Sequence, residues 1–169
     1  QLSPFACRVV VMHGYLQDEE FAQLYGAASF YVNASRCEGL CLPLMEFMSC
    51  ARPVIAPDHT AMRDYIDERV AFVVKSSREP TIWPEDARIL YRTLRHRPDW
   101  GSLKTAYAQS YAMAKDQPQT WHAMADAASE RMRDYCSFTP VQQRLAQFFG
   151  QAPVIAVTPA AAKTGTAAC

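Results

Sequence analysis

The stretch that decides the fold is Glu38-Gly39-Leu40-Cys41-Leu42-Pro43-Leu44-Met45-Glu46. Residues 29–33, just before it, are mostly aromatic or β-branched and predict a buried strand. Residues 42–50 predict a helix, because Pro43 suits a first helical turn. Residues 53–56 predict the next strand. The stretch is therefore the turn of a strand–loop–helix–strand unit, and it carries two carboxylates.

The predicted helix has almost no polar face, so we expect it to be buried nearly all round, with Glu46 in the middle of that surface. A buried carboxylate is costly unless it is paired or hydrogen-bonded. The helix begins without a Ser, Thr, Asp or Asn cap, and free N–H groups after a glycine-containing loop can bind a phosphate. The alternative is that Glu46 interacts favourably with the helix dipole near the N-terminus or pairs with an arginine such as Arg52. The sequence leaves both interpretations open.

The neighbouring segments extend this unit into a sheet. Residues 8–12 predict a first strand ending at His13-Gly14, and residues 18–28 predict a helix capped by Asp18. A short helix from residue 58 and a last strand at 70–74 follow. Four strands separated by helices predict an α/β domain with a Rossmann-like, doubly wound parallel sheet. Ligands bind such sheets at the carboxyl ends of the strands, where the quoted stretch lies.

The chain beyond residue 75 predicts helices. They are expected at residues 84–95, 99–115 and 118–135, and the arginines at 88, 92, 95 and 97 are expected on a solvated helix face. Residues 141–149 predict another helix, either a terminal helix or one that crosses to a partner domain. The Ala-, Thr-, Pro- and Gly-rich residues 151–169 predict a disordered tail or linker after a domain at 1–150.

The composition narrows the classes of function. The chain has 169 residues, a length that suffices for one domain with a full hydrophobic core. Its formal net charge of zero argues against a broad nucleic-acid interface. It has no apolar run long enough to span a bilayer and no secretory signal. The six cysteines match no zinc-binding spacing, so we expect mostly reduced thiols in a cytoplasmic protein and no metal.

These residues carry a resemblance to a known family. Residues 25–39, Leu42-Pro43-Leu44-Met45-Glu46 and Arg52-Pro53-Val54-Ile55-Ala56 resemble the donor-binding domain of retaining glycosyltransferases with the GT-B fold, of the group 1 type. Those enzymes carry two glutamates separated by seven residues, the spacing of Glu38 and Glu46. The resemblance is strong over about residues 8–75 and weaker in the helical remainder.

The resemblance implies a role for each residue. Glu46 would hold the ribose hydroxyls of a nucleotide-sugar donor, and Glu38 would be the catalytic residue facing the donor sugar. The backbone of Gly39, Leu40, Cys41 and Leu42 would bind the diphosphate or the sugar oxygens. Gly14 would approach the base or the diphosphate. The departing diphosphate helps as a base in such enzymes, so neither a metal nor another cofactor is implied.

The sequence departs from the family pattern at several positions. Cys41 stands where the family usually has a second glycine, which would strain the backbone if that position needs a positive φ. The family's diphosphate-binding Arg and Lys lie upstream of the first strand, and nothing before Arg8 matches them. The acceptor-binding domain, which could supply peripheral membrane contact, is not recognisable either. We therefore expect an N-terminally truncated fragment that binds donor weakly and does not turn over.

Three functions remain open. The resemblance favours transfer of a hexosyl-type sugar to a glycan or glycoconjugate, by analogy in bacterial surface-polysaccharide assembly at the inner face of the membrane. A sugar-nucleotide epimerase with the GT-B fold is an alternative, although the two glutamates fit a transferase better. A non-catalytic interaction domain derived from a glycosyltransferase is the third, because of Cys41 and the unmatched basic pair.

Overall fold

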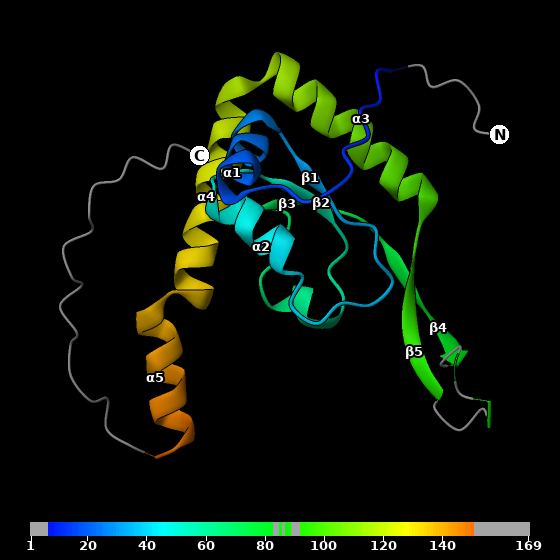
Figure 1. Cartoon of the computed structure of the whole chain (residues 1–169), viewed down its shortest axis with the longest axis vertical. Coiled ribbons are helices and arrows are strands. Elements are labelled where there is room, and N and C mark those ends of the chain that lie inside the picture. The colour runs from blue at the N-terminus through cyan, green and yellow to red at the C-terminus, as the bar shows by residue number, and fades with distance from the viewer. Residues whose placement is uncertain (1–6, 83–84, 86, 89–91, 151–169) are drawn as a thin grey trace.

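Figure 1 shows the computed structural model, which describes residues 7–82, 85, 87–88 and 92–150. Among these residues, a parallel sheet with its helices forms the main body, and an antiparallel hairpin extends away from it (Figure 1). The chain is thus a mixed α/β domain, as predicted. The predicted tail at 151–169 lies outside the described residues.

The parallel sheet has the order β1-β2-β3, so β2 (Val54–Ala56) lies between β1 (Tyr31–Val32) and β3 (Ala71–Val73). Its register places Val32 beside Ile55 and Ile55 beside Phe72. All three residues of β2 are buried, because this strand has a neighbour on each side. Each strand lies within a predicted segment, so these three predictions are confirmed.

The predicted first strand at residues 8–12 is wrong. These residues have no regular secondary structure and pair with no strand in the described part of the chain, and Val9 and Val11 are 50% and 84% exposed. The β-branched residues supply the propensity for a strand, but a strand also requires a partner edge, which is a tertiary property. The described sheet therefore has three strands instead of four.

Helices cover both faces of this sheet. Val54 shares a core cluster with Met48 and Met132 on one face, whereas Ile55 packs with Leu103 on the other. The division follows from the alternation of side chains along a strand. The α-helices and the 3₁₀ turn are α1 (Asp18–Ala27), α2 (Leu42–Ser49), η1 (Thr60–Asp64), α3 (Trp100–Asp116), α4 (Pro118–Cys136) and α5 (Phe138–Phe148).

The helices α1, α3, α4 and α5 confirm the predictions for their segments, but the predicted cap of α1 is wrong. Asp18 is the first helical residue and Gln17 is the N-cap, with its N–H bonded to the Glu20 carboxylate at 2.8 Å. A glutamate three positions into a helix reaches back to the N-cap in this way. In the described part of the chain, every helix is too short or too polar to cross a bilayer.

The helix α2 is less buried than predicted. Leu44, Met45, Phe47 and Met48 are buried, but Leu42 is 58% exposed and Glu46 is exposed as well. Positions 42, 46 and 49 lie on one side of a helix, and all three are exposed, although the Tyr25 hydroxyl of α1 reaches the Glu46 carboxylate. The prediction of a helix buried all round, with Glu46 inside the apolar surface, is therefore wrong.

The helix predicted at residues 84–95 is also wrong. Residues 92–95 belong to β5 (Arg92–Pro98), which pairs antiparallel with β4 (Ser76–Ile82), while residues 83–84, 86 and 89–91 lie outside the described residues. The register places Glu79 opposite Arg95. Opposite charges in such a cross-strand pair stabilise a hairpin. The alternation of Leu94 and His96 with Arg95 and Arg97 has the period of a strand, so the prediction of a solvated helix face for these arginines is wrong as well.

Candidate functional site

The loop from the end of β1 to the start of α2, residues 33–41, carries most of the candidate residues. Asn33 joins the two ends of this loop. The Asn33 N–H donates to Ile55 O at 2.9 Å, which extends the pairing of β1 with β2. Its side-chain oxygen accepts from the Ser35 N–H at 2.6 Å, an Asx-type turn. Its Nδ2 donates to the sulfur of Cys41 and, at 3.4 Å, to Glu38 Oε1. One buried amide thus ties both ends of the loop together.

Cys41 is the N-cap of α2 and has left-handed backbone angles, with φ 55° and ψ 62°. We expected strain at Cys41 only if this position has a positive φ. It does, so the backbone of Cys41 is strained. Cys41 is 7% exposed, and burial raises the pKa of its thiol. The residue is consequently a neutral, buried packing group rather than a reactive thiolate.

The backbone between the two glutamates presents unpaired donors. Within the described residues, the N–H groups of Gly39, Leu40, Cys41 and Leu42 donate no hydrogen bond. A Cβ built on Gly39 would have nothing within 4 Å, so this part of the loop faces open space. The Tyr65 hydroxyl donates to the Leu40 carbonyl and holds the loop from below. Four free N–H groups at a helix start can receive an anionic oxygen.

Glu38 and Glu46 are fixed in different ways. Glu38 is half-buried, and its backbone N–H donates to Thr60 Oγ1 at 3.3 Å. Glu46 lies in the second turn of α2, where its Oε2 accepts from the Tyr25 hydroxyl at 2.8 Å. Burial and this carboxylate raise the pKa of Tyr25, so the tyrosine keeps its proton and donates it. Both carboxylates therefore border the loop with oxygen atoms able to accept from hydroxyl groups.

Arg52 does not act as the alternative partner of Glu46. Its guanidinium donates to Gly26 O at 2.8 Å and lies over the Trp121 ring, 5.3 Å from the ring centre. The pairing of Glu46 with Arg52, one of the two possibilities that the sequence left open, is therefore not observed. Glu46 is held by α1 through Tyr25 instead.

Gly14 is not brought to the loop by any described contact. It is exposed and has φ 109°, a conformation that glycine adopts readily. It lies in the irregular segment that precedes α1, where the predicted strand is absent. A position at the end of a strand was the reason to include Gly14, and the described residues do not provide that strand.

Sequence reasoning missed the contribution of the hairpin. His59 is 1% exposed; its Nε2 lies 3.0 Å from Ser35 O, and its ring stacks on His96 at 4.4 Å between ring centres. The His96 N–H donates to Arg36 O at 2.7 Å. Burial lowers the pKa of His96, and nearby His59, Arg78 and Arg63 lower it further. The strand period of residues 92–98 was the one signal that could have revealed this contact.

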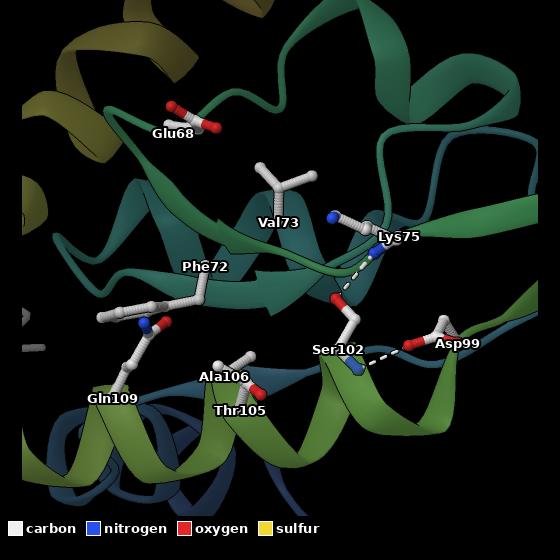
Figure 2. Close-up of a pocket in the computed structure, with 9 residues that line it drawn as sticks. All are labelled: Glu68, Phe72, Val73, Lys75, Asp99, Ser102, Thr105, Ala106 and Gln109. Carbon is white, nitrogen blue, oxygen red and sulfur yellow. Dashed lines mark hydrogen bonds between the residues drawn. The ribbon is translucent and has the colours of Figure 1, made fainter.

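Two cavities lined by described residues lie away from the loop. Figure 2 shows one of about 450 Å³ between β3 and the first half of α3. Asp99 there caps α3 by accepting from the Ser102 N–H at 2.6 Å, and the Ser102 hydroxyl accepts from the Lys75 N–H at 3.0 Å (Figure 2). These polar groups already serve the fold, so the loop remains the better candidate. The cavity is lined by Glu68, Phe72, Val73, Lys75, Asp99, Ser102, Thr105, Ala106 and Gln109.

A second cavity, of about 610 Å³, lies between the sheet and α3, and its lining includes Phe30, Val32 and Tyr107. It contains none of the candidate residues. Among the described residues, no three His, Cys, Asp or Glu side chains gather in a way that could hold a metal ion.

Comparison with known proteins adds an independent line of evidence. Residues 2–91 match the family model described as "Glycosyl transferases group 1". A segment of 55 residues, 32% of the chain, is 38% identical to the O-antigen chain mannosyltransferase B of Escherichia coli. The segment covers 14% of that protein. No solved structure matches the chain.

Proposed function

Because the chain belongs to the group 1 glycosyltransferases, we propose that its β1–α2 loop is the donor site of a retaining enzyme that binds a nucleotide sugar. The observation that carries this proposal is the set of four free N–H groups at residues 39–42, placed between Glu38 and Glu46 at the carboxyl end of β1. A nucleotide sugar needs acceptors for its hydroxyls on both sides of donors for its diphosphate, and the loop offers this order.

Glu46 would bind the ribose of the donor. Its exposed carboxylate keeps Oε1 available, because the hydrogen bond from Tyr25 engages Oε2. A carboxylate accepts from two neighbouring hydroxyls, so it suits a ribose diol. The Tyr25 contact would reduce the rotamer freedom that Glu46 loses on binding, and so favour affinity.

The N–H groups of Gly39 to Leu42 would receive the diphosphate or the sugar oxygens at the start of α2. The helix dipole and unpaired N–H groups favour negative charge there without a basic side chain. Glu38 would orient the donor sugar and stabilise positive charge at the reacting carbon, while the departing diphosphate takes the proton of the acceptor. We propose no metal and no other cofactor for this step.

The complete protein would add what this chain does not show. The matched segment covers only 14% of the mannosyltransferase, so activity, acceptor and further domains are proposed for a larger protein. We propose that it contains an acceptor-binding half and basic residues for the diphosphate, and that its strands complete a doubly wound sheet. By analogy with that relative, mannose in an activated form is the first sugar to test, with a cell-surface polysaccharide as acceptor.

A ligand-observed NMR titration tests this proposal directly. The probes are UDP, GDP and ADP, together with UDP-glucose and GDP-mannose. We expect saturable binding of one nucleotide, weakened at least about tenfold by Glu46→Ala because hydrogen bonds to a charged group are lost.

Glu130→Ala is the matched control, since Glu130 is also an exposed helical glutamate and lies on α4, away from the loop. It should bind like the unchanged chain. Equal binding by the Glu46→Ala variant would contradict the proposed site. A titration of the full-length protein separates a loop that needs its other half from one that binds nothing.

A further inference from the structure

The backbone of the candidate loop is held at three points by segments far along the chain. His59 Nε2 lies 3.0 Å from Ser35 O, the His96 N–H donates to Arg36 O at 2.7 Å, and the Glu38 N–H donates to Thr60 Oγ1 at 3.3 Å. These contacts cover the residues leading to Glu38 and Glu38 itself. The position of this carboxylate therefore depends on η1 and on the hairpin as well as on β1.

His59 contacts both of the other residues that hold the loop, Thr60 and His96. A carbonyl oxygen is only an acceptor, so the bond to Ser35 requires the proton of the imidazole on Nε2. The other ring nitrogen, Nδ1, then lies 3.2 Å from Thr60 Oγ1, and the ring stacks on His96. Because His59 is 1% exposed, its ring is fixed by packing and can transmit a fixed geometry to the loop.

Thr60 has a backbone conformation that suggests a function. Its φ of 50° is unusual for a β-branched residue, and such strain persists only where the surroundings impose it. Its hydroxyl accepts from the Glu38 N–H and donates to His59 O at 2.8 Å. The strained residue thus supplies a contact to the loop that glycine, the residue best suited to this φ, could not supply.

The hairpin also contacts the loop, next to His59. Arg36 lies 3.6 Å from Glu79 on β4, and Glu79 also pairs with Arg95 at 2.6 Å and with Arg97 at 3.0 Å. Glu79 therefore links the loop to both strands of the hairpin. Ser76 Oγ lies 3.2 Å from His96 Nδ1, which orients the ring that stacks on His59.

We propose that Thr60 and His59, backed by the hairpin β4–β5, are positioning residues that hold Glu38 toward the donor sugar. This inference rests on the proposed donor site. It adds that the two glutamates of the site are supported by different parts of the fold. Glu46 is held by α1 through Tyr25, whereas the Glu38 backbone is held by η1 directly and by the hairpin through Arg36, and its carboxylate also accepts from Asn33 at 3.4 Å. Loosening the second support should therefore weaken recognition of the sugar and leave recognition of the nucleotide intact.

The test compares Thr60→Ala with Thr60→Ser in the full-length protein. Neither alanine nor serine has a β-branched side chain, so both variants relieve the same backbone strain at residue 60. They differ in the hydroxyl group, which the alanine variant lacks and the serine variant keeps. Affinities for GDP and GDP-mannose, and for UDP and UDP-glucose, are measured by calorimetry. For Thr60→Ala we expect roughly threefold weaker binding of the nucleotide sugar, the effect of one lost hydrogen bond at an exposed site, with the nucleotide unchanged.

A second readout needs no ligand. Hydrogen exchange of the Glu38 amide should be faster in Thr60→Ala than in the unchanged chain, and restored in Thr60→Ser. Equal loss of nucleotide and nucleotide-sugar binding, or no loss of either, would overturn the positioning role. If the unchanged protein binds no nucleotide sugar although the Glu38 amide responds as expected, the proposed donor site fails, and the assignment to sugar recognition fails with it.

Discussion

The body of the domain and the hairpin β4–β5 are held together by different forces. In the body, Leu44, Met48 and Tyr65 have no exposed surface and pack in one apolar cluster around the sheet. In the hairpin, Ile82 and Leu94 are 46% and 55% exposed, and the order comes from strand pairing and the Glu79 ion pairs. Apolar burial is non-directional and strong, whereas exposed ion pairs contribute little.

The candidate loop lies where these two regions meet. Asn33 and Tyr65 hold it from the body, and His96 holds it from the hairpin. The comparison therefore predicts that mutations in the two regions have two different effects. Changes in the body should unfold the domain, and changes in the hairpin should alter the loop while the domain stays folded.

The largest effect is expected from Met48→Ala, on the buried face of α2. Met48 has no exposed surface, so its truncation should cost about 2–5 kcal/mol of unfolding free energy through lost burial and a cavity. The measurement is urea unfolding followed by circular dichroism. The control is Leu42→Ala on the same helix, which is 58% exposed and should change stability by no more than about 0.5 kcal/mol. Similar losses for both variants would contradict the observed orientation of α2.

The same division explains what could be predicted from the sequence. The body was predictable because β2 and the long helices carry apolar periodicities that tertiary contacts reinforce. The hairpin was not, because the ion pairs of Glu79 with Arg95 and Arg97 join residues whose pairing is unknown before the fold is known. Residues 8–12 failed for the opposite reason, since their strand propensity lacked a partner edge in the described chain.

The candidate site was predictable in position and only partly in environment. The spacing of Glu38 and Glu46 placed both on the β1–α2 loop and helix, as the structure has them. The exposure of Glu46 depends on which side of α2 is left uncovered, and the support of Glu38 depends on His59 and the hairpin. These are relations between segments distant in sequence, and the strand period of residues 92–98 is the one local pattern that bears on them.

A smaller effect is expected at Cys41, where the body sets the geometry of the loop. Cys41→Val places a β-branched residue at φ 55° and should cost about 1–3 kcal/mol of stability. Cys41→Gly should be close to neutral, because relief of about 1 kcal/mol of left-handed strain offsets the loss of a buried thiol of similar worth. Thermal unfolding of both variants checks this order. A glycine variant less stable than the valine variant would show that packing of the thiol outweighs the backbone strain.

The smallest effect is expected from His96, on the hairpin side, and it appears as a dependence on pH. Burial lowers the pKa of His96, with His59, Arg78 and Arg63 adding to the shift and Asp58 opposing it. A depressed pKa means that the unfolded chain binds the proton more readily. The stabilising contribution is therefore complete above the unfolded pKa of about 6.5 and is lost as pH falls through the lower folded value.

Urea unfolding between pH 7.5 and 5 should consequently show a shallower loss of stability in His96→Gln than in the unchanged chain. The carboxylates Asp67 and Glu79 do not confuse this window, because their pKa values are lowered and they protonate only in more acidic solution. Hydrogen exchange of the Arg36–Glu38 segment should report the same change before global unfolding does, since the His96 ring stacks on His59 beside that segment. Loss of stability with no earlier exchange in the loop would mean that the hairpin and the body unfold as one unit, and the division between them would then be only geometric.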